Sequence, residues 1–208
     1  MTGAAQLTRV FEGLASRIDA SGFRSVGFTS ALSGEGTTTT ALGTALSLAA
    51  LRDETVLLVD ANWLQPSLTA DAGAEKAGGL ADHLATRGEL AGLLRWASRP
   101  RLAFLPVGDR AVARPSLRAL SSFLAGKVAS HGTVVVDLPP ILAGEAFVLP
   151  WAGLLDQLFV VLREGATPLP VVRQALARLG PSATPQIVLN RAAVAAADLA
   201  PALHPVRA

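Results

Sequence analysis

A run of small residues at positions 30–39, SALSGEGTTT, has the composition of a phosphate-binding loop. It lies between an apolar stretch at 26–29 and a segment with helical periodicity. Glycines let the backbone turn its N–H groups toward a phosphate, and the start of a helix adds partial positive charge. A strand, a glycine-rich loop and a helix in this order are the context in which such a loop functions.

The loop matches the P-loop pattern at every position except the lysine. The pattern requires Gly or Ala, four residues, Gly, Lys, and then Ser or Thr, and this chain has Ala31, Gly36, Thr37 and Thr38. The lysine would place a full charge against the β- and γ-phosphates, whereas a threonine hydroxyl donates one hydrogen bond without charge. Losing such a preorganised charge typically costs about 3 kcal/mol of transition-state stabilisation.

Six loop residues are therefore candidates for binding a nucleotide, and the hydroxyl of Thr38 is a candidate ligand for Mg²⁺. The alternative is an ordinary strand–turn–helix connection with a threonine N-cap. The six candidates are Gly34, Glu35, Gly36, Thr37, Thr38 and Thr39.

Polar side chains also end three apolar runs elsewhere in the chain. The run TVLLVD ends at Asp60, TVVVD ends at Asp137, and QIVLN ends at Asn190. In a parallel sheet the carboxyl ends of the strands share one rim, where ligands bind. A carboxylate there can hold Mg²⁺ directly or through water, so Asp60 and Asp137 are candidate metal ligands and, in an active enzyme, catalytic residues. The alternative for each is an aspartate that forms a turn.

Short apolar runs alternate with helical patterns, which predicts a three-layer α/β/α fold with a mostly parallel sheet, similar to P-loop NTPases. We expect one domain over 1–208 that begins with a helix at about 4–19, and a small, polar loop at 67–78. Strands are expected at 24–29, 55–60, 102–107, 133–137, 157–162 and 186–190. Further helices are expected at 37–51, 80–84, 89–96, 115–128, 168–179 and 192–203.

Composition excludes several classes of function. The 208 residues include no cysteine, and the three histidines lack the spacing of metal ligands. A net charge of +2 gives no reason to expect nucleic-acid binding. No uncharged apolar run is long enough to span a membrane and no signal-peptide pattern begins the chain, so we expect a cytoplasmic protein.

These motifs resemble those of the bacterial tyrosine kinases (BY-kinases) of capsular and exopolysaccharide systems, which belong to the MinD/ParA-type P-loop ATPases. FTSALSGEGTTTT occupies the place of the phosphate loop, which usually contains Gly-Glu-Gly-Lys. VLLVDANWLQPSL resembles the second nucleotide motif, Asp-Ala-Asp-Leu-Arg-Arg-Pro, and TVVVDLPPIL resembles the Asp-Thr-Pro-Pro motif. The resemblance extends over nearly the whole chain.

The chain departs from the family pattern at the positions that carry charge. Thr37 replaces the lysine, Asn62 replaces the second aspartate of the second motif, and Leu64 and Gln65 replace its arginines. Leu138 replaces the threonine of the third motif. The chain contains no tyrosine, so it cannot phosphorylate itself on the tyrosine tail that the family uses. The N-terminal Glu–Arg–Arg pattern that builds the family's oligomeric ring is also broken, with Arg9, Glu12 and Ala15 in its place.

The resemblance therefore implies a catalytically impaired relative, a pseudokinase that is not an enzyme. It would act through protein contacts in polysaccharide polymerisation or export, with a membrane co-polymerase or chain-length regulator as partner, peripherally at the inner membrane. Binding of ATP or ADP with Mg²⁺ would be weak or absent, and Asn190 would contact adenine if a nucleotide binds. A homo-oligomer is compatible with this reading, and no nucleic-acid partner is expected.

The alternative is a nucleotide-dependent enzyme or a MinD/ParA-like switch with an atypical P-loop. An arginine would then supply the charge that Thr37 lacks, either Arg163 or Arg191 of the same chain or one from a neighbouring subunit. Trp63, in the second motif, would either be exposed to a partner or pack locally over the sheet.

Overall fold

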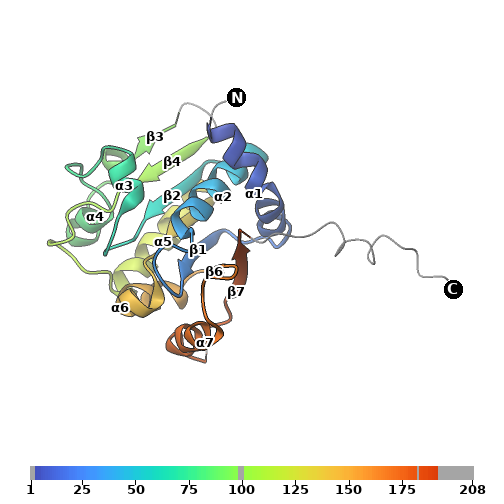
Figure 1. The fold of residues 1–208 in the computed structure, drawn as a ribbon. Helices are drawn as coiled ribbons and strands as arrows, with labels where there is room; N and C mark the ends of the chain where they lie inside the picture. Colours follow the sequence, from blue (N-terminus) through green and yellow to red (C-terminus); the bar gives the residue numbers. More distant parts are fainter. Residues whose placement is uncertain (1–2, 98–100, 182, 192–208) are drawn as a thin grey trace.

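The computed structural model describes residues 3–97, 101–181 and 183–191, with side chains described from residue 11 onward except at position 129. In this part of the chain, helices cover both faces of a seven-stranded sheet (Figure 1). The strands are β1 Ser25–Ser30, β2 Val56–Asp60, β3 Arg95–Trp96, β4 Leu102–Leu105, β5 Thr133–Asp137, β6 Gln157–Arg163 and β7 Gln186–Asn190. The helices are α1 Gly3–Ala20, α2 Thr37–Leu51, α3 Ser67–Asp71, α4 Leu80–Thr86, α5 Leu117–His131, α6 Ile141–Ala152 and α7 Leu169–Arg178, with a 3-10 turn at Ala91–Leu93.

The strand order is β3-β4-β2-β5-β1-β6-β7, and every neighbouring pair is parallel except β3 with β4. Strands β1 and β5 lie side by side, with Val26 opposite Val135. This arrangement confirms the expected α/β fold class with a mostly parallel sheet. It also brings the carboxyl ends of β1, β2 and β5 to one rim.

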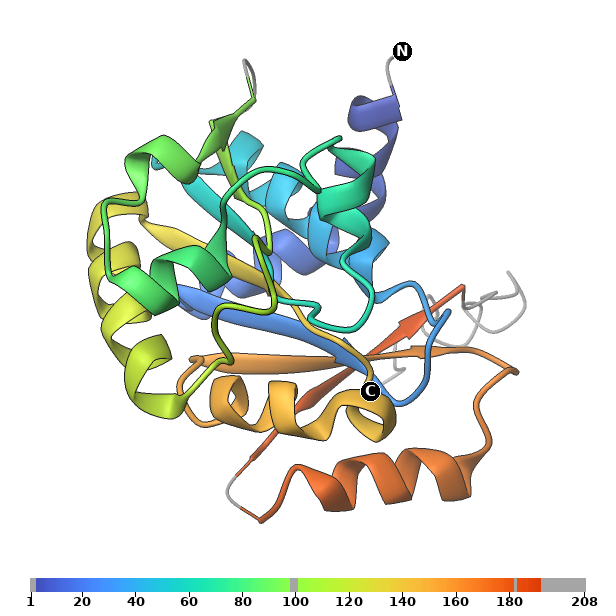
Figure 2. The same cartoon turned by 90° about the vertical axis from the view of Figure 1, so that its left-hand side faces the viewer.

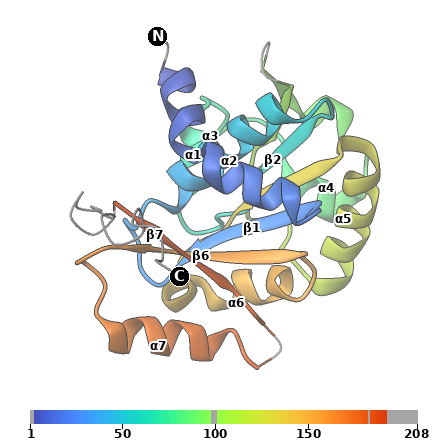
Figure 3. The same ribbon diagram turned by 90° about the vertical axis from the view of Figure 1, so that its right-hand side faces the viewer.

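The central strands β1, β2 and β5 are buried along their whole length and mostly apolar, because helices cover the sheet on both faces. Alternate residues belong to two separate cores: Leu57 and Val59 of β2 face one, whereas Val56 and Leu58 face the other. Figure 3 shows α1 and α2 on one side of β1 and β6, with α6 and α7 on the opposite side. In Figure 2 the same pair, α6 in gold and α7 in orange, lies along one face of the sheet.

The N-terminal helix α1 packs closely on α2. Ala15 and Ile18 are buried, and the ring of Phe11 lies directly over Gly43. A Cβ atom at Gly43 would be 2.0 Å from this ring. The third position of the family's oligomerisation pattern, Ala15, therefore faces the core of its own chain.

The helix expected at 89–96 is wrong. Only residues 91–93 form a 3-10 turn, and Arg95 and Trp96 form the short strand β3. Arg95 pairs antiparallel with Phe104 of β4, and the N–H of Ala97 donates to the carbonyl of Leu102 over 2.9 Å. The leucine spacing fits a helix, but the backbone of residues 95–97 instead forms hydrogen bonds with the edge strand β4.

Other boundaries also differ from the expectation. The polar segment at 67–78 contains helix α3, and α6 was not expected because Gly144 and Pro150 interrupt its pattern. Helix α5 begins at Leu117 rather than at Pro115, because the hydroxyl of Ser116 caps it. The helix expected at 192–203 lies outside the described residues. Among the described helices, none combines the length and apolar character needed to cross a bilayer.

Candidate functional site

The loop between β1 and α2 has the geometry of an anion cradle. Gly34 and Gly36 adopt φ angles of +85° and +90°, which favour glycine. Within the described part of the chain, the N–H groups of residues 33–39 donate to no backbone or side-chain acceptor, and the next N–H, of Thr40, donates to the carbonyl of Gly36. Unpaired N–H groups at a loop that opens a long helix form a site for phosphate oxygens.

Hydrogen bonds of the buried Glu35 fix the position of this loop. Its side chain is only 3% exposed, and one carboxylate oxygen accepts the N–H of Leu32 over 2.9 Å. The other oxygen accepts the hydroxyl of Thr167. The amide of Asn190 donates to the carbonyl of Glu35 over 2.8 Å, which ties the loop to the end of β7. In this structure Glu35 and Asn190 therefore position the loop, and adenine binding by Asn190 stays a prediction.

A cavity of about 330 Å³ opens above the loop. Its walls come from the loop, from the start of α2, from the segment after β2 and from the segment after β5. Every residue that lines it in the described structure is uncharged: Ser30, Ser33, Gly34, Gly36, Thr37, Thr38, Thr39, Asn62, Leu64, Gln65, Ser67, Leu138 and Pro140. Thr37 and Leu64 stand where the family pattern has lysine and arginine, so no described residue places a cation on the walls of the cavity.

Asp137 does not line this cavity itself, but it is hydrogen-bonded to Thr38, which does. The Thr38 hydroxyl donates to Oδ2 of Asp137 over 2.9 Å and lies 3.3 Å from the hydroxyl of Ser67. The other oxygen of Asp137, Oδ1, is buried without a hydrogen-bond partner in the described structure. Burial, reinforced by the charge of Asp60, raises the pKa of Asp137 well above its usual value, and the Thr38 hydrogen bond opposes the shift.

Asp60 is paired with Asp137 across β2 and β5, but its oxygens are already engaged. Oδ1 accepts the N–H of Asn62 over 3.1 Å, and Oδ2 accepts both the N–H and the hydroxyl of Thr69 over 2.8 and 2.7 Å. Burial raises the pKa of Asp60, and the hydrogen bonds from Thr69 and Asn62 oppose the shift. Asp60 thus anchors the segment that walls the cavity.

The donor set fits Mg²⁺ only in part. A hydroxyl at Thr38 and the unpaired oxygen of Asp137 are the hard oxygen ligands that Mg²⁺ prefers, with the remaining positions taken by phosphate and water. Asp60 fits less well because both of its oxygens accept hydrogen bonds. The described residues contain no group of three acidic or histidine side chains that could hold a metal without a nucleotide.

The structure brings Thr38, Asp60, Asp137 and Asn190 to one rim, as the sequence predicts. The two arginines suggested as replacements for the lysine, Arg163 and Arg191, are exposed and do not line the cavity. Trp63 is 5% exposed and stacks on Phe147, so it packs locally.

Two site residues have no signal in the sequence. Ser67 reaches the Thr38 hydroxyl from α3, and Thr167 reaches Glu35 from the connection between β6 and α7. Single hydroxyl residues in polar segments belong to no motif, so only the tertiary contact identifies them.

Comparison with known proteins supports the resemblance. No protein-family model and no curated protein matches the sequence. Among solved structures, the VpsO kinase domain is similar with 28% identity and a TM-score of 0.76, over 91% of this chain and 95% of that chain. The kinase domain of the Escherichia coli tyrosine kinase ETK is similar with 20% identity and a TM-score of 0.73, over 92% and 78%.

The same fold occurs in a ParA family ATPase from Chlorobium tepidum, with 21% identity and a TM-score of 0.61 over 85% of this chain and 78% of that chain. The chain has the P-loop fold of the bacterial tyrosine-kinase domains and the MinD/ParA-type ATPases.

Proposed function

We propose that this protein is a catalytically impaired relative of the bacterial tyrosine kinases that acts through protein contacts in exopolysaccharide or capsule assembly. The observation that carries the proposal is a P-loop cradle to which no described residue contributes a cation. The N–H groups of the loop donate to no described acceptor, and the described residues that line the cavity above them are all uncharged.

The missing charge affects turnover more than binding. Backbone N–H groups and the helix start hold a phosphate in its ground state without a lysine. In phosphoryl transfer the negative charge on the transferred group must be stabilised by positioned cations, so their loss raises the barrier directly. With Thr37, Leu64 and Gln65 in the three cationic positions, we expect weak nucleotide binding and turnover near background.

Isothermal calorimetry with ATP, with and without Mg²⁺, tests the site. We expect weak binding that Mg²⁺ strengthens, because Thr38 and Asp137 supply oxygen ligands. The variant Thr38→Val removes the hydroxyl at nearly constant volume and should abolish the effect of Mg²⁺. Thr86→Val is a matched control, because the Thr86 hydroxyl bonds only within α4 and its following turn.

The second candidate function is a nucleotide-dependent switch or ATPase. The preformed cradle and the Thr38–Asp137 contact favour it, and the cation would come from another subunit because neither Arg163 nor Arg191 lines the cavity. ATP hydrolysis per subunit that rises with protein concentration and is lost in Asp137→Ala would favour this function over the first. Turnover at background at all concentrations would exclude it.

The proposed role in polysaccharide assembly rests on the likeness to kinase domains. We infer that the partner is a membrane co-polymerase or chain-length regulator, and that the protein reaches the inner membrane only through this partner. Crosslinking in cells, followed by identification of the captured membrane protein, tests the inference. A protein that fractionates away from membranes and captures no such regulator would contradict it.

A further inference from the structure

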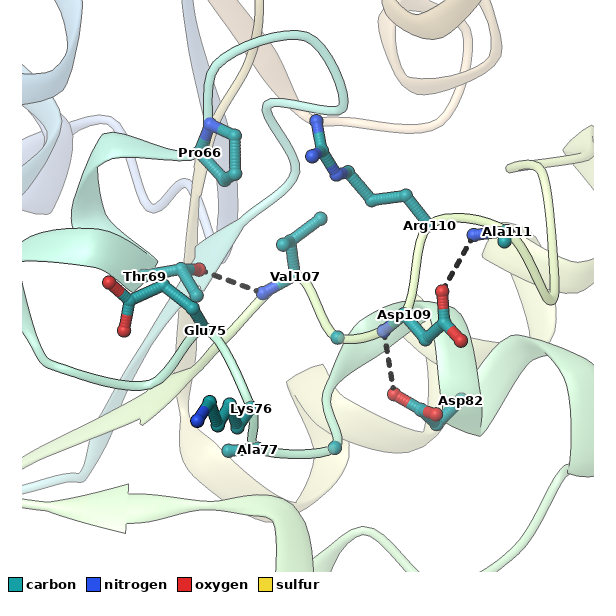
Figure 4. A pocket seen from close by; sticks show the side chains of 12 residues that line it. Pro66, Thr69, Glu75, Lys76, Ala77, Asp82, Val107, Asp109, Arg110 and Ala111 are labelled. Atoms are coloured by element: carbon teal, nitrogen blue, oxygen red, sulfur yellow. Dashed lines mark hydrogen bonds between the residues drawn. The ribbon is translucent and has the colours of Figure 1, made fainter.

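A second cavity, larger than the P-loop cavity, lies beside it. Its volume is about 720 Å³, and Figure 4 shows it between the segment that contains α3 and the segment that follows β4. The residues that line it are Pro66, Thr69, Glu75, Lys76, Ala77, Gly78, Asp82, Val107, Gly108, Asp109, Arg110 and Ala111. None of these residues lines the P-loop cavity, so the two cavities are separate.

Two cations on these walls form no salt bridge with a described residue, although the positive charge of Arg110 partly offsets the raised pKa of Asp60. The described residues form three salt bridges, and neither Lys76 nor Arg110 takes part in any of them. In Figure 4 Arg110 lies at one end of the cavity and Lys76 at the other. Each of these two cations can pair with an oxyanion, although the carboxylates of Glu75, Asp82 and Asp109 line the same cavity.

Three carboxylates in the lining of the cavity, those of Glu75, Asp82 and Asp109, disfavour an anion with more than one negative charge. Asp82 accepts the N–H groups of Gly79 and Asp109 over 2.8 and 3.1 Å, and Asp109 accepts the N–H of Ala111 over 2.9 Å. These bonds leave further acceptor positions on each carboxylate, because an ionised carboxylate has about four. Together with Glu75 they would repel a dianion and would accept hydrogen bonds from hydroxyl or amino groups.

Arg110 connects this cavity to the P-loop cavity. Its Nη1 donates to the carbonyl of Trp63 over 2.7 Å and more weakly to that of Leu64 over 3.3 Å. Leu64 lines the P-loop cavity, so the guanidinium of one cavity holds the wall of the other. The hydrogen bonds of Arg110 within the described structure all come from Nη1, and its Nε and Nη2 groups donate to no described residue.

Thr69 forms a second connection. Its hydroxyl donates to Asp60 over 2.7 Å and accepts the N–H of Val107 over 3.0 Å. Thr69 and Val107 line the larger cavity, whereas Asp60 lies at the rim beside Asp137. A change in the position of the Val107 segment would therefore reach the carboxylate pair through one hydroxyl.

We propose that the larger cavity binds a small, singly charged carboxylate with several hydrogen-bond donors, such as a sugar acid, and that its occupancy is coupled to the P-loop cavity through Arg110. The carboxylate pairs with Arg110 or Lys76, and the hydroxyl groups donate to Asp82, Asp109 and Glu75. A bound anion fixes the guanidinium, which in turn fixes the Trp63 and Leu64 carbonyls. The coupling, but not the site itself, rests on the proposed weak binding of a nucleotide in the P-loop cavity.

Titration of D-glucuronate into ¹⁵N-labelled protein, followed by NMR, tests the site. We expect the amide signals of Gly78, Gly108 and Ala111 to shift together with one dissociation constant. Arg110→Gln should weaken binding at least about tenfold, because it removes a charge-assisted, two-donor contact. Lys76→Gln should weaken it less, and Arg114→Gln should have no effect because Arg114 is exposed in the same segment and does not line the cavity.

Two further probes separate the possible ligand chemistries. D-glucose has the hydroxyl groups without the charge and should not bind, and inorganic phosphate should shift the signals of residues 33–39 rather than those of the larger cavity. Unchanged Gly78 and Gly108 signals at saturating glucuronate would overturn the proposal. A response to phosphate in place of glucuronate, or equal binding by Arg110→Gln, would overturn it as well.

The coupling is tested by repeating the ATP titration with glucuronate present. We expect ATP affinity to rise about fivefold, at the lower end of typical couplings, and the rise to disappear in Arg110→Gln. If ATP does not bind, the expected weak nucleotide binding fails, but glucuronate should still shift the amide signals of Asn62, Leu64 and Gln65. Unaltered signals at these three residues would exclude the connection through Arg110.

Discussion

The most informative single residue is Thr37, which lines the P-loop cavity where the family pattern has a lysine. The surrounding loop keeps its two positive-φ glycines and its unpaired N–H groups. The loop therefore has the backbone geometry of a phosphate cradle without the lysine, and adding a cation there should strengthen nucleotide binding.

Thr37→Lys should strengthen ATP binding about tenfold to a hundredfold, which corresponds to about 1–3 kcal/mol for a charged hydrogen bond. Calorimetry of both proteins under identical Mg²⁺ measures the change. Thr39→Lys adds the same charge at an exposed position of the same cavity and should give a smaller gain. Turnover should stay low because Asn62 and Leu138 remain. Equal binding by wild type and Thr37→Lys would show that the loop no longer receives phosphate.

The two loop glycines provide a matched pair of variants. Both have positive φ, but a Cβ at Gly36 would be 2.2 Å from the Asn190 amide nitrogen, whereas a Cβ at Gly34 meets nothing within 4 Å. Gly34→Ala should lower the free energy of unfolding by about 1 kcal/mol through backbone strain alone, and Gly36→Ala should lower it by more. Urea unfolding measures both. If Asn190→Ala does not reduce the difference between the two variants, the contact between Asn190 and the loop is not tight.

At the scale of elements, the last turn of α5 contacts the short edge strand β3. His131 is buried at the end of α5 and its ring stacks on Trp96 of β3 at a centroid distance of 6.3 Å. Burial, and secondarily the charge of Lys127, lowers the pKa of His131 below the usual value of 6.5. The ring is therefore neutral in the folded protein at neutral pH.

This lowered pKa gives a defined pH dependence. Below about pH 6.5 the unfolded chain binds a proton at this histidine that the folded protein does not, so stability should fall as the pH falls from 6.5 through the lowered pKa. His131→Gln removes the titration and should flatten the dependence between pH 7 and pH 5. Urea midpoints at the two pH values measure it, and an equal loss of stability in wild type and variant would contradict the expectation. The lowered pKa of His83 adds to this slope, whereas the raised pKa values of Asp60 and Asp137 oppose it. The comparison of wild type with His131→Gln therefore isolates the contribution of His131.

At the scale of the whole molecule, a kinase-like fold is combined with a chain that contains no tyrosine. Transfer of a phosphoryl group to tyrosine would therefore need an acceptor outside this sequence. The uncharged walls of the P-loop cavity predict that this transfer is also slow.

We expect no phosphorylation of a tyrosine-rich tail peptide by this protein with Mg²⁺ and radiolabelled ATP. An active bacterial tyrosine-kinase domain assayed in parallel is the positive control. Transfer that depends on Mg²⁺ and is abolished by Asp137→Ala would contradict catalytic impairment. Persistence of the signal in Asp137→Ala would instead indicate a contaminating kinase.

The sequence by itself determined the central strands, the loop at 30–39, the carboxylates at the ends of β2 and β5 and the absence of the lysine. Strands buried on both faces are nearly continuous apolar runs, so these strands and the polar residues that end β2 and β5 can be identified from the local sequence pattern. The tertiary structure alone decided that Glu35 is held by Thr167 and Asn190, that Asp60 is held by Thr69, and that residues 95–96 form a strand. These contacts join segments far apart in the chain, and a polar side chain or an open strand edge finds its partner only after the sheet has formed.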